Sequence, residues 1–207
     1  MKPILCDDYY IYSFAEELLH MFENVTRSMQ SFGNLSDANI QEVIRRLKVL
    51  HVKKEQQLVK EGHICREFYF IDRGSFRSYM IMETGAEAIT NLYIANDWMF
   101  DYQSFIGQKP AESIIEAAEE SQVFELTAHH FHELVKASDV FFRLGTIFQQ
   151  AIQNQDYQNN RLSPEEKYKL LLARKPGIIQ KFPLKYIASY MGMTPETLSR
   201  TRRKMIS

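Results

Sequence analysis

Four cations fall within five positions near the end of the sequence, in the run RTRRK at residues 200–204. A guanidinium can donate paired hydrogen bonds to O6 and N7 of guanine, and a carboxylate can accept one from N4 of cytosine. Glu196 and Arg200 are four residues apart, so on a helix they lie one turn apart on one face. This spacing predicts two side chains that read neighbouring base pairs in the major groove of DNA.

The residues around this pair favour contacts with phosphates. Hydroxyls and cations that bind phosphate oxygens fix the position of a protein on the duplex without reading its sequence. The candidates are Thr194, Ser199, Arg202, Arg203 and Lys204. Two alternatives stay open: a carboxylate near a helix start also stabilises the helix dipole, and terminal arginines can form a solvated last turn.

Two short helices across a glycine are predicted to hold these side chains. Apolar residues recur at helical spacing from 184 to 191, and Gly192 can take the left-handed conformation that ends a helix. Thr194 is then suited to cap a second helix, with Pro195 at its first position. The inward stripe of that helix consists of Leu198, Thr201 and Met205. This arrangement predicts a helix-turn-helix.

The charge distribution agrees with a basic module attached to an acidic one. Residues 1–160 hold 14 Lys and Arg against 23 Asp and Glu, a net charge of −9, whereas residues 161–207 hold 11 against 3, a net charge of +8. Phosphate neutralisation supplies most of the nonspecific affinity for nucleic acid, so we expect only the C-terminal part to meet the polyanion.

The middle of the chain is predicted to be β structure. Gly62, Gly74 and Gly85 punctuate residues 50–126 at intervals of 12 and 11 residues, the turn rhythm of a small sandwich or barrel. The expected strands are 68–71, 75–82, 87–94, 113–118 and 122–126. Helices are expected before them at 13–30 and 36–47, the second capped by Ser36 or Asp37.

Helical patterns return after the strands. Thr127 can cap the helix AHHFHELVKA, and a long helix is predicted from about 139 to 160. Its apolar residues recur at alternating steps of four and three, as in a coiled coil: Val140, Leu144, Ile147 and Ala151. This seam predicts pairing with a second copy, because helix-turn-helix proteins commonly bind two half-sites. The alternative is that the helix packs on the β region of its own chain.

The order of these elements resembles that of the Crp/Fnr transcription regulators over nearly the whole chain. Glu196 to Arg200 is similar to the Glu-Thr-hydrophobic-small-Arg run of the family's recognition segment, although Pro195 stands where the family often has an Arg. Ile71 and Gly74 in YFIDRGSFRSY match its Tyr-x-Ile-x-x-Gly hairpin. The resemblance implies an α+β fold: an N-terminal antiparallel β-roll with flanking helices, a long dimerisation helix and a C-terminal helix-turn-helix. The implied domains are 1–137, 138–160 and 161–207.

The resemblance also implies a function. A homodimer would bind double-stranded DNA and RNA polymerase, and a change in the β-roll would reorient the two recognition helices through the long helix. Two alternatives remain: a ligand-sensing or protein-interaction module without operator binding, and a metal-dependent cupin-like enzyme. Since the N-terminal stretch lacks a signal peptide and no run of about 18 apolar residues occurs, we expect a cytoplasmic protein.

The identity of an effector does not follow from the resemblance. Family members that bind cyclic nucleotides hold the phosphate with a Gly-Glu pair and an Arg-Ser pair, but residues 100–115 contain no Arg, and Glu112 would repel an anion. We therefore do not expect cyclic AMP. We do not expect an iron–sulfur cluster either, because Cys6 is the only N-terminal cysteine. Residues that could line a pocket, if they are not ordinary core, are Trp98, Phe100, Tyr102, Phe105 and Glu112.

One further cluster could bind a metal. His129, His130, His132 and Glu133 offer enough ligands, and a cupin-like enzyme would hold its metal inside a barrel. On a short helix, however, these side chains point in different directions. We therefore expect neither a metal site nor catalytic residues.

Overall fold

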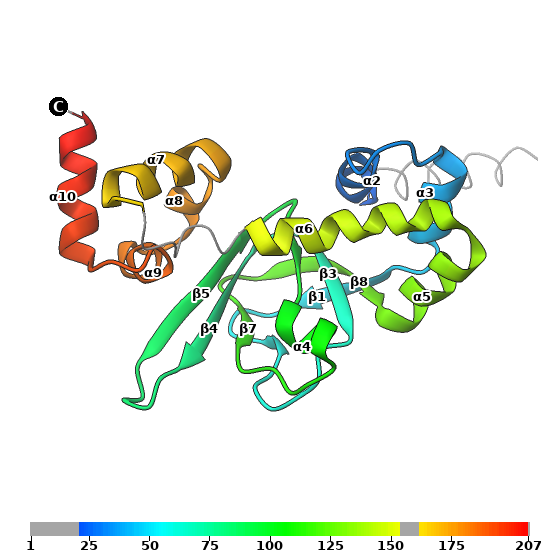
Figure 1. Cartoon of the computed structure of the whole chain (residues 1–207), viewed down its shortest axis with the longest axis horizontal. Coiled ribbons are helices and arrows are strands. Elements are labelled where there is room, and N and C mark those ends of the chain that lie inside the picture. The colour runs from blue at the N-terminus through cyan, green and yellow to red at the C-terminus, as the bar shows by residue number, and fades with distance from the viewer. Residues whose placement is uncertain (1–20, 154–161, 207) are drawn as a thin grey trace, which may run out of the picture.

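The computed structural model describes residues 21–153 and 162–206. Their strands form two four-stranded antiparallel sheets, ordered β1-β8-β3-β6 and β2-β7-β4-β5, with helices at both ends (Figure 1). We call residues 48–127 the β-roll. Its strands are β1 (Lys48–Val52), β2 (Gln57–Val59), β3 (Glu67–Arg73), β4 (Ser75–Ile81), β5 (Glu87–Ile94), β6 (Trp98–Met99), β7 (Ile114–Ala117) and β8 (Ser121–Thr127). The α+β class with an antiparallel β-roll is confirmed.

The predicted strands and turns are found in place. All five expected strands are present, and Gly62, Gly74 and Gly85 have φ angles of 80°, 105° and 80°. Gly74 is also held by close packing, since an added Cβ would lie 2.0 Å from Oγ of Ser121. Only glycine combines this conformation with this approach, so the turn between β3 and β4 requires it.

The β-roll has an aromatic core. Phe68, Phe70 and Phe124 are fully buried, and Phe70 pairs with Phe124 across β3 and β8, with their rings stacked at 6.3 Å. Each such ring contributes about 1.5–3 kcal/mol by leaving water. This core makes the β-roll a rigid support for the elements attached to it.

Two N-terminal helices pack beside the β-roll, α2 (Glu23–Gln30) and α3 (Asp37–Ile44). Ser36 is the N-cap of α3: its Oγ accepts a hydrogen bond from the amide of Asn39, and its own amide donates one to Oδ1 of Asn39. The part of the expected helix 13–30 that precedes residue 21 lies outside the described residues.

The prediction of one long helix at 139–160 is wrong for the first part of that range. After α5 (Ala128–Ala137), whose cap is Thr127 as predicted, the chain forms a 3₁₀ helix, η1 (Asp139–Gly145), and only then α6 (Thr146–Gln153). Phe141 and Leu144 are both buried. A 3₁₀ turn places residues i and i+3 on the same side, so it lets both side chains enter the core. Residues 154–160 lie outside the described part.

The proposed dimer seam needs a correction for the same reason. Leu144 and Ile147 are at most 1% exposed and belong to the core of their own β-roll, so they cannot face a second copy in this structure. Val140 is partly buried against that core, and the side chain of Ala151 lies outside the description. The alternative interpretation, packing on the chain's own β region, therefore holds for Leu144 and Ile147.

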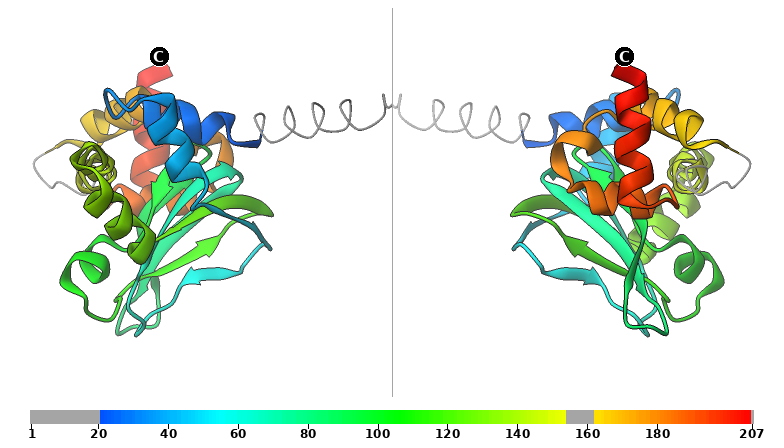
Figure 2. Two further views of the ribbon diagram at one scale, coloured as in Figure 1. Left: turned by 90° about the vertical axis from the view of Figure 1, so that its right-hand side faces the viewer. Right: turned by 90° about the vertical axis from the view of Figure 1, so that its left-hand side faces the viewer.

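Residues 162–206, which we call the C-terminal module, form four helices. They lie against β5, and α10 forms the outer edge of the molecule (Figures 1 and 2). The helices are α7 (Pro164–Arg174), α8 (Ile178–Lys181), α9 (Leu184–Tyr190) and α10 (Pro195–Ile206). Of these, α7 and α8 were not predicted from the sequence.

Candidate nucleic-acid interface and effector pocket

The turn between α9 and α10 forms as its residue types predict. Gly192 has a φ of 64°, the left-handed conformation that ends α9. Oγ1 of Thr194 accepts a hydrogen bond from the amide of Thr197 at 3.2 Å, and Pro195 is the first residue of α10. The two helices thus meet across a short turn whose geometry is fixed by local interactions.

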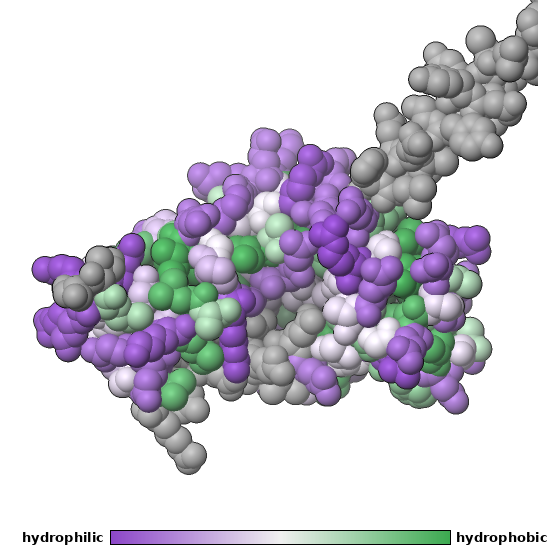
Figure 3. Space-filling model, turned by 90° about the horizontal axis from the view of Figure 1, so that it is seen from above, coloured by the Kyte–Doolittle hydropathy of each residue, from purple (hydrophilic) through white to green (hydrophobic). Residues whose placement is uncertain are grey.

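The two faces of α10 differ as expected. Leu198 and Thr201 are buried at 0% and 3% exposure and Met205 is partly buried, so the inward stripe is confirmed. The predicted contact residues lie on the remaining surface: Thr194, Glu196, Arg200, Arg203 and Lys204 are exposed, and Ser199 and Arg202 are half-buried. Hydrophilic residues dominate this end of the molecule when it is viewed from above (Figure 3).

The candidate residues are not equally available to a ligand. Hydrogen bonds from its own backbone amide and from Thr194 lower the pKa of Glu196. Its carboxylate is therefore already hydrogen-bonded at the start of α10. Nζ of Lys204 lies 3.2 Å from Oε1 of Glu165 and ties α10 to α7. Arg200 is exposed on the outward face, which makes it the strongest candidate for base contact.

A residue that the sequence did not suggest stabilises the turn between α9 and α10. Lys167 on α7 is only 5% exposed, and its Nζ donates a hydrogen bond to the carbonyl of Met191 at 2.9 Å, at the C-terminus of α9. Burial lowers the pKa of this lysine. The cation therefore caps α9 next to the turn that leads into α10. No spacing rule links two residues 24 positions apart, so only the fold reveals this contact.

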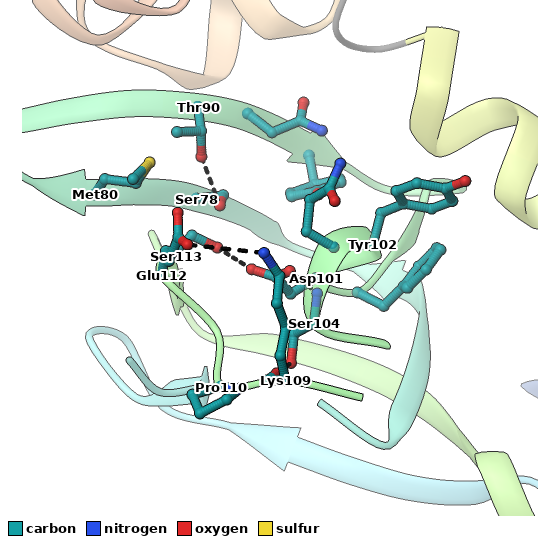
Figure 4. A pocket seen from close by; sticks show the side chains of 14 residues that line it. Ser78, Met80, Thr90, Asp101, Tyr102, Ser104, Lys109, Pro110, Glu112 and Ser113 are labelled. Carbon is teal, nitrogen blue, oxygen red and sulfur yellow. Dashed lines mark hydrogen bonds and ion pairs between the residues drawn. The ribbon is translucent and has the colours of Figure 1, made fainter. Parts of the chain in front are cut away.

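A cavity of about 570 Å³ opens in the β-roll between β4, β5, α4 (Tyr102–Gly107) and the loop that follows it (Figure 4). Three of the expected residues, Phe100, Tyr102 and Glu112, line it. The other two were assigned wrongly, because they are core residues. Trp98 donates from Nε1 to Oγ of Ser28 at 3.0 Å, and the ring of Phe105 packs 4.3 Å from that of Phe68.

The polar groups of this cavity bond mainly to one another. Asp101 accepts hydrogen bonds from the amide of Ser104 at 2.8 Å and from Oγ of Ser113 at 2.6 Å. Among the residues described as lining the cavity, Lys109 is the only Lys or Arg, and it lies 3.9 Å from Oε1 of Glu112. The described lining therefore contains no guanidinium that could hold a cyclic phosphate.

Comparison with known proteins finds one domain model and several relatives that match parts of this chain. Residues 49–138 match the cyclic nucleotide-binding domain. The chain is 25% identical over 185 residues to the fumarate and nitrate reduction regulatory protein of Vibrio cholerae, covering 78% of this chain and 69% of that protein.

Two solved structures share the fold of this chain. FixK2 from Bradyrhizobium japonicum aligns with a TM-score of 0.62 at 15% identity, covering 77% of this chain and 84% of that one. The catabolite activator protein of Thermus thermophilus aligns with a TM-score of 0.53 at 14% identity, covering 84% and 85%. The chain is a homologue of the Crp/Fnr transcription regulators. This homology supports a DNA-binding transcription regulator.

The histidine cluster on α5 and the cysteines have side chains of the kinds that bind metals. Within residues 21–153 and 162–206 no group of three His, Cys, Asp or Glu side chains is arranged to hold a metal ion. His129 lies 3.4 Å from Glu133 on α5, and Cys65 is buried, while Cys6 lies outside the described residues. None of the described helices is long and apolar enough to cross a membrane.

Proposed function

We propose that this Crp/Fnr homologue is a homodimeric, cytoplasmic regulator that reads a specific DNA sequence with α10. The observation that carries the proposal is the construction of that helix. Leu198 and Thr201 anchor one face in the module, while the opposite face exposes Arg200 and its neighbouring cations. A short amphipathic helix that ends a helix-turn-helix in a module with seven excess positive charges suits the major groove.

The roles divide by position on α10. Arg200 reads a base edge, because it is exposed one turn into the helix and a guanidinium makes the commonest specific contact, to guanine. Glu196 assists from the first turn, although part of its hydrogen bonding serves the helix start. The phosphate contacts come from Thr194, Ser199, Arg202, Arg203 and Lys204. In this proposal residues 1–137, 138–160 and 161–207 are the sensor, dimer helix and reader.

A second copy would pair along the outward face of η1 and α6. Phe142 on this segment is 65% exposed, whereas Leu144 and Ile147 face the core. Since single large apolar side chains are common on protein surfaces, the oligomeric state must be measured. Sedimentation equilibrium of the full chain should give twice the chain mass, and a monomer at micromolar concentration contradicts the homodimer.

The cavity is proposed to bind a small effector other than cyclic AMP, with RNA polymerase as the downstream partner. Lys109, the cation of the cavity lining, lies near Glu112, so an anionic phosphate would compete with a carboxylate for it. Calorimetric titration of the purified protein with cyclic AMP should show no saturable heat. Stoichiometric binding with a micromolar Kd would overturn this part of the proposal.

The reading role of α10 can be tested with one substitution and one matched control. A duplex is first selected from a random library by the native protein, and binding is measured by fluorescence anisotropy at two salt concentrations. Arg200→Ala should lose about 1–3 kcal/mol on the selected duplex and little on a scrambled one. Lys53→Ala removes an exposed cation from the β-roll and should leave both affinities unchanged. Equal losses on the two duplexes, or a library that yields no preferred sequence, would contradict sequence reading.

A further inference from the structure

The C-terminal module and the β-roll share one hydrophobic cluster. From the β-roll it contains Tyr79 on β4, Ile89 and Leu92 on β5, and Ile114 on β7. These residues pack with buried apolar residues of α7, α8, α9 and α10, among them Ile178 and Ile187. The module therefore completes its core on the outer face of this sheet, and its position follows that of the strands.

Arg77 lies at the centre of the polar part of this contact. On the module side, its Nη1 donates a hydrogen bond to Oη of Tyr186 on α9 at 3.1 Å. On the β-roll side, its Nε and Nη2 donate to Oε1 of Glu116 at 3.2 and 2.9 Å, and Nη1 also pairs with Glu87. The side chains of Arg77 and Glu116 are only 12% and 10% exposed. Buried, multiply bonded charges of this kind hold a fixed geometry.

The opposite face of the same strands lines the cavity. On β4, Ser78 and Met80 face the cavity, whereas Arg77 and Tyr79 take part in the contact with the module. This alternation follows from the strand geometry, in which successive side chains point to opposite faces. Figure 4 shows the cavity residues on one side of the two strands and the ribbon of the module on the other. One layer of backbone separates the two sites.

A β-bulge in β5 has contacts on both faces of the sheet. Ser78 pairs with Asn91 and Tyr79 with Ile89, so Thr90 is the extra residue in β5. Oγ1 of Thr90 donates to Oγ of Ser78 at 2.8 Å on the cavity side. The amide of the preceding residue, Ile89, donates to Oγ of Ser189 on α9 at 3.0 Å. Two adjacent residues at the bulge thus form hydrogen bonds on opposite faces of the sheet, one on the cavity side and one with the module.

Two ion pairs extend the contact at its edge. Nζ of Lys175 lies 2.9 Å from Oδ2 of Asp97, in the turn after β5, and Nζ of Lys181 lies 2.8 Å from Oε1 of Glu119, in the turn after β7. The Lys175 pair is the more enclosed, with side chains 12% and 21% exposed. These pairs complete a docking surface formed by β4, β5 and the neighbouring turns.

We propose that Arg77 is a positioning residue for the C-terminal module, and that the bulge at Thr90 transmits occupancy of the cavity directly to α9. The route crosses one sheet within one chain and does not pass through α6 or a second copy. It rests on the proposed effector role of the cavity but not on α10 reading a sequence, because docking of the module can be followed without DNA. Failure of sequence reading therefore leaves this proposal standing.

The first test adds a large side chain at two places on the cavity lining of the full-length protein. Thr90→Trp places it at the bulge, on the wall shared with the module, whereas Gln103→Trp places it on α4, where the native side chain is exposed. Hydrogen–deuterium exchange is then followed in peptides of α9, without DNA. Thr90→Trp should raise the exchange of α9 amides severalfold, and Gln103→Trp should leave it unchanged. Equal effects of the two variants, or no effect of either, overturn the transmission through Thr90.

The second test removes the contact itself. Arg77→Met should raise exchange in α9 by about tenfold or more, since it breaks several charged hydrogen bonds. Arg46→Met is the matched control, because Arg46 is a partly buried, paired arginine on the far side of the β-roll. The milder variants Tyr186→Phe and Ser189→Ala remove single hydroxyls and decide the question if Arg77→Met does not fold. Native exchange of α9 in both of these variants, with a folded β-roll, would rule out the positioning role.

Discussion

The β-roll and the C-terminal module obtain their cores in different ways. Phe68, Phe70 and Phe124 are enclosed within the strands of the β-roll and its flanking helices, and the main cluster of that core contains no residue of the module. The module buries Tyr168, Leu171 and Leu198 in a cluster that includes Ile89 and Leu92 of the β-roll. The comparison shows that one region encloses its own core, whereas the other depends on its neighbour.

The largest effect is expected where the β-roll is most enclosed. Phe68→Ala should lower the free energy of unfolding by about 3–5 kcal/mol, because it leaves a cavity among packed rings. The measurement is urea denaturation followed by circular dichroism. Met82→Ala, at a side chain that is 50% exposed in the turn between β4 and β5, should change it by less than about 0.5 kcal/mol. If the two variants are equally stable, the aromatic cluster does not stabilise the fold.

Leu92→Ala sharpens the contrast, because this residue belongs to a β-roll strand but packs in the cluster of the module. Its loss should cost about 2–5 kcal/mol. Hydrogen exchange should show the damage mainly in α9 and α8, while β3 and β8 stay protected. Protection lost first in β3 and β8 would mean that the module does not depend on this strand.

The two helix caps allow a matched comparison of smaller size. Ser36→Ala in α3 and Thr194→Ala in α10 each remove a hydroxyl that accepts a backbone hydrogen bond, so each should cost about 1 kcal/mol. Only Thr194→Ala should weaken DNA binding, as measured by anisotropy. A comparable loss of affinity in Ser36→Ala would show that DNA binding reports general stability.

The smallest effect concerns pH. Burial lowers the pKa of Lys167 in the folded protein, so between its folded and unfolded pKa values the unfolded chain binds more protons. Stability from this group therefore rises as pH increases through that window toward the unfolded value of about 10.4. Urea denaturation of the native protein and of Lys167→Met at pH 7 and pH 9.5 isolates this contribution. The native protein should gain more than the variant, and parallel behaviour would mean that the ammonium is not desolvated.

The sequence revealed the elements whose signals are local. Gly192, Thr194 and Pro195 determined the turn and the start of α10, and the spacing of the glycines that end at Gly85 indicated a strand at 87–94, as observed. The strands β1, β2 and β6 were missed because they are short and lack a clear alternation. The 3₁₀ helix η1 was also missed, since an apolar spacing of three and four residues fits two helix types until the core is known.

Assignments that depend on tertiary contacts were less successful. Among the aromatic residues proposed for the cavity, Trp98 and Phe105 are core, because residue type alone does not distinguish a pocket wall from a packed interior. Leu144 and Ile147 have coiled-coil spacing yet pack inward, since the β-roll offers the nearer apolar surface. Contacts between distant residues, such as Lys167 with Met191 and Arg77 with Tyr186, leave no pattern in the sequence.

The double use of β4 and β5 limits how this protein can be re-engineered. If residues 162–206 were joined to a different β-roll, they would pack on a sheet that lacks Tyr79, Ile89 and Leu92. Part of their apolar core would then be exposed to solvent. A stable chimaera should therefore carry the hairpin 75–94 with the module, and that hairpin also lines the cavity. The C-terminal module cannot be exchanged together with its supporting strands without also changing the cavity lining.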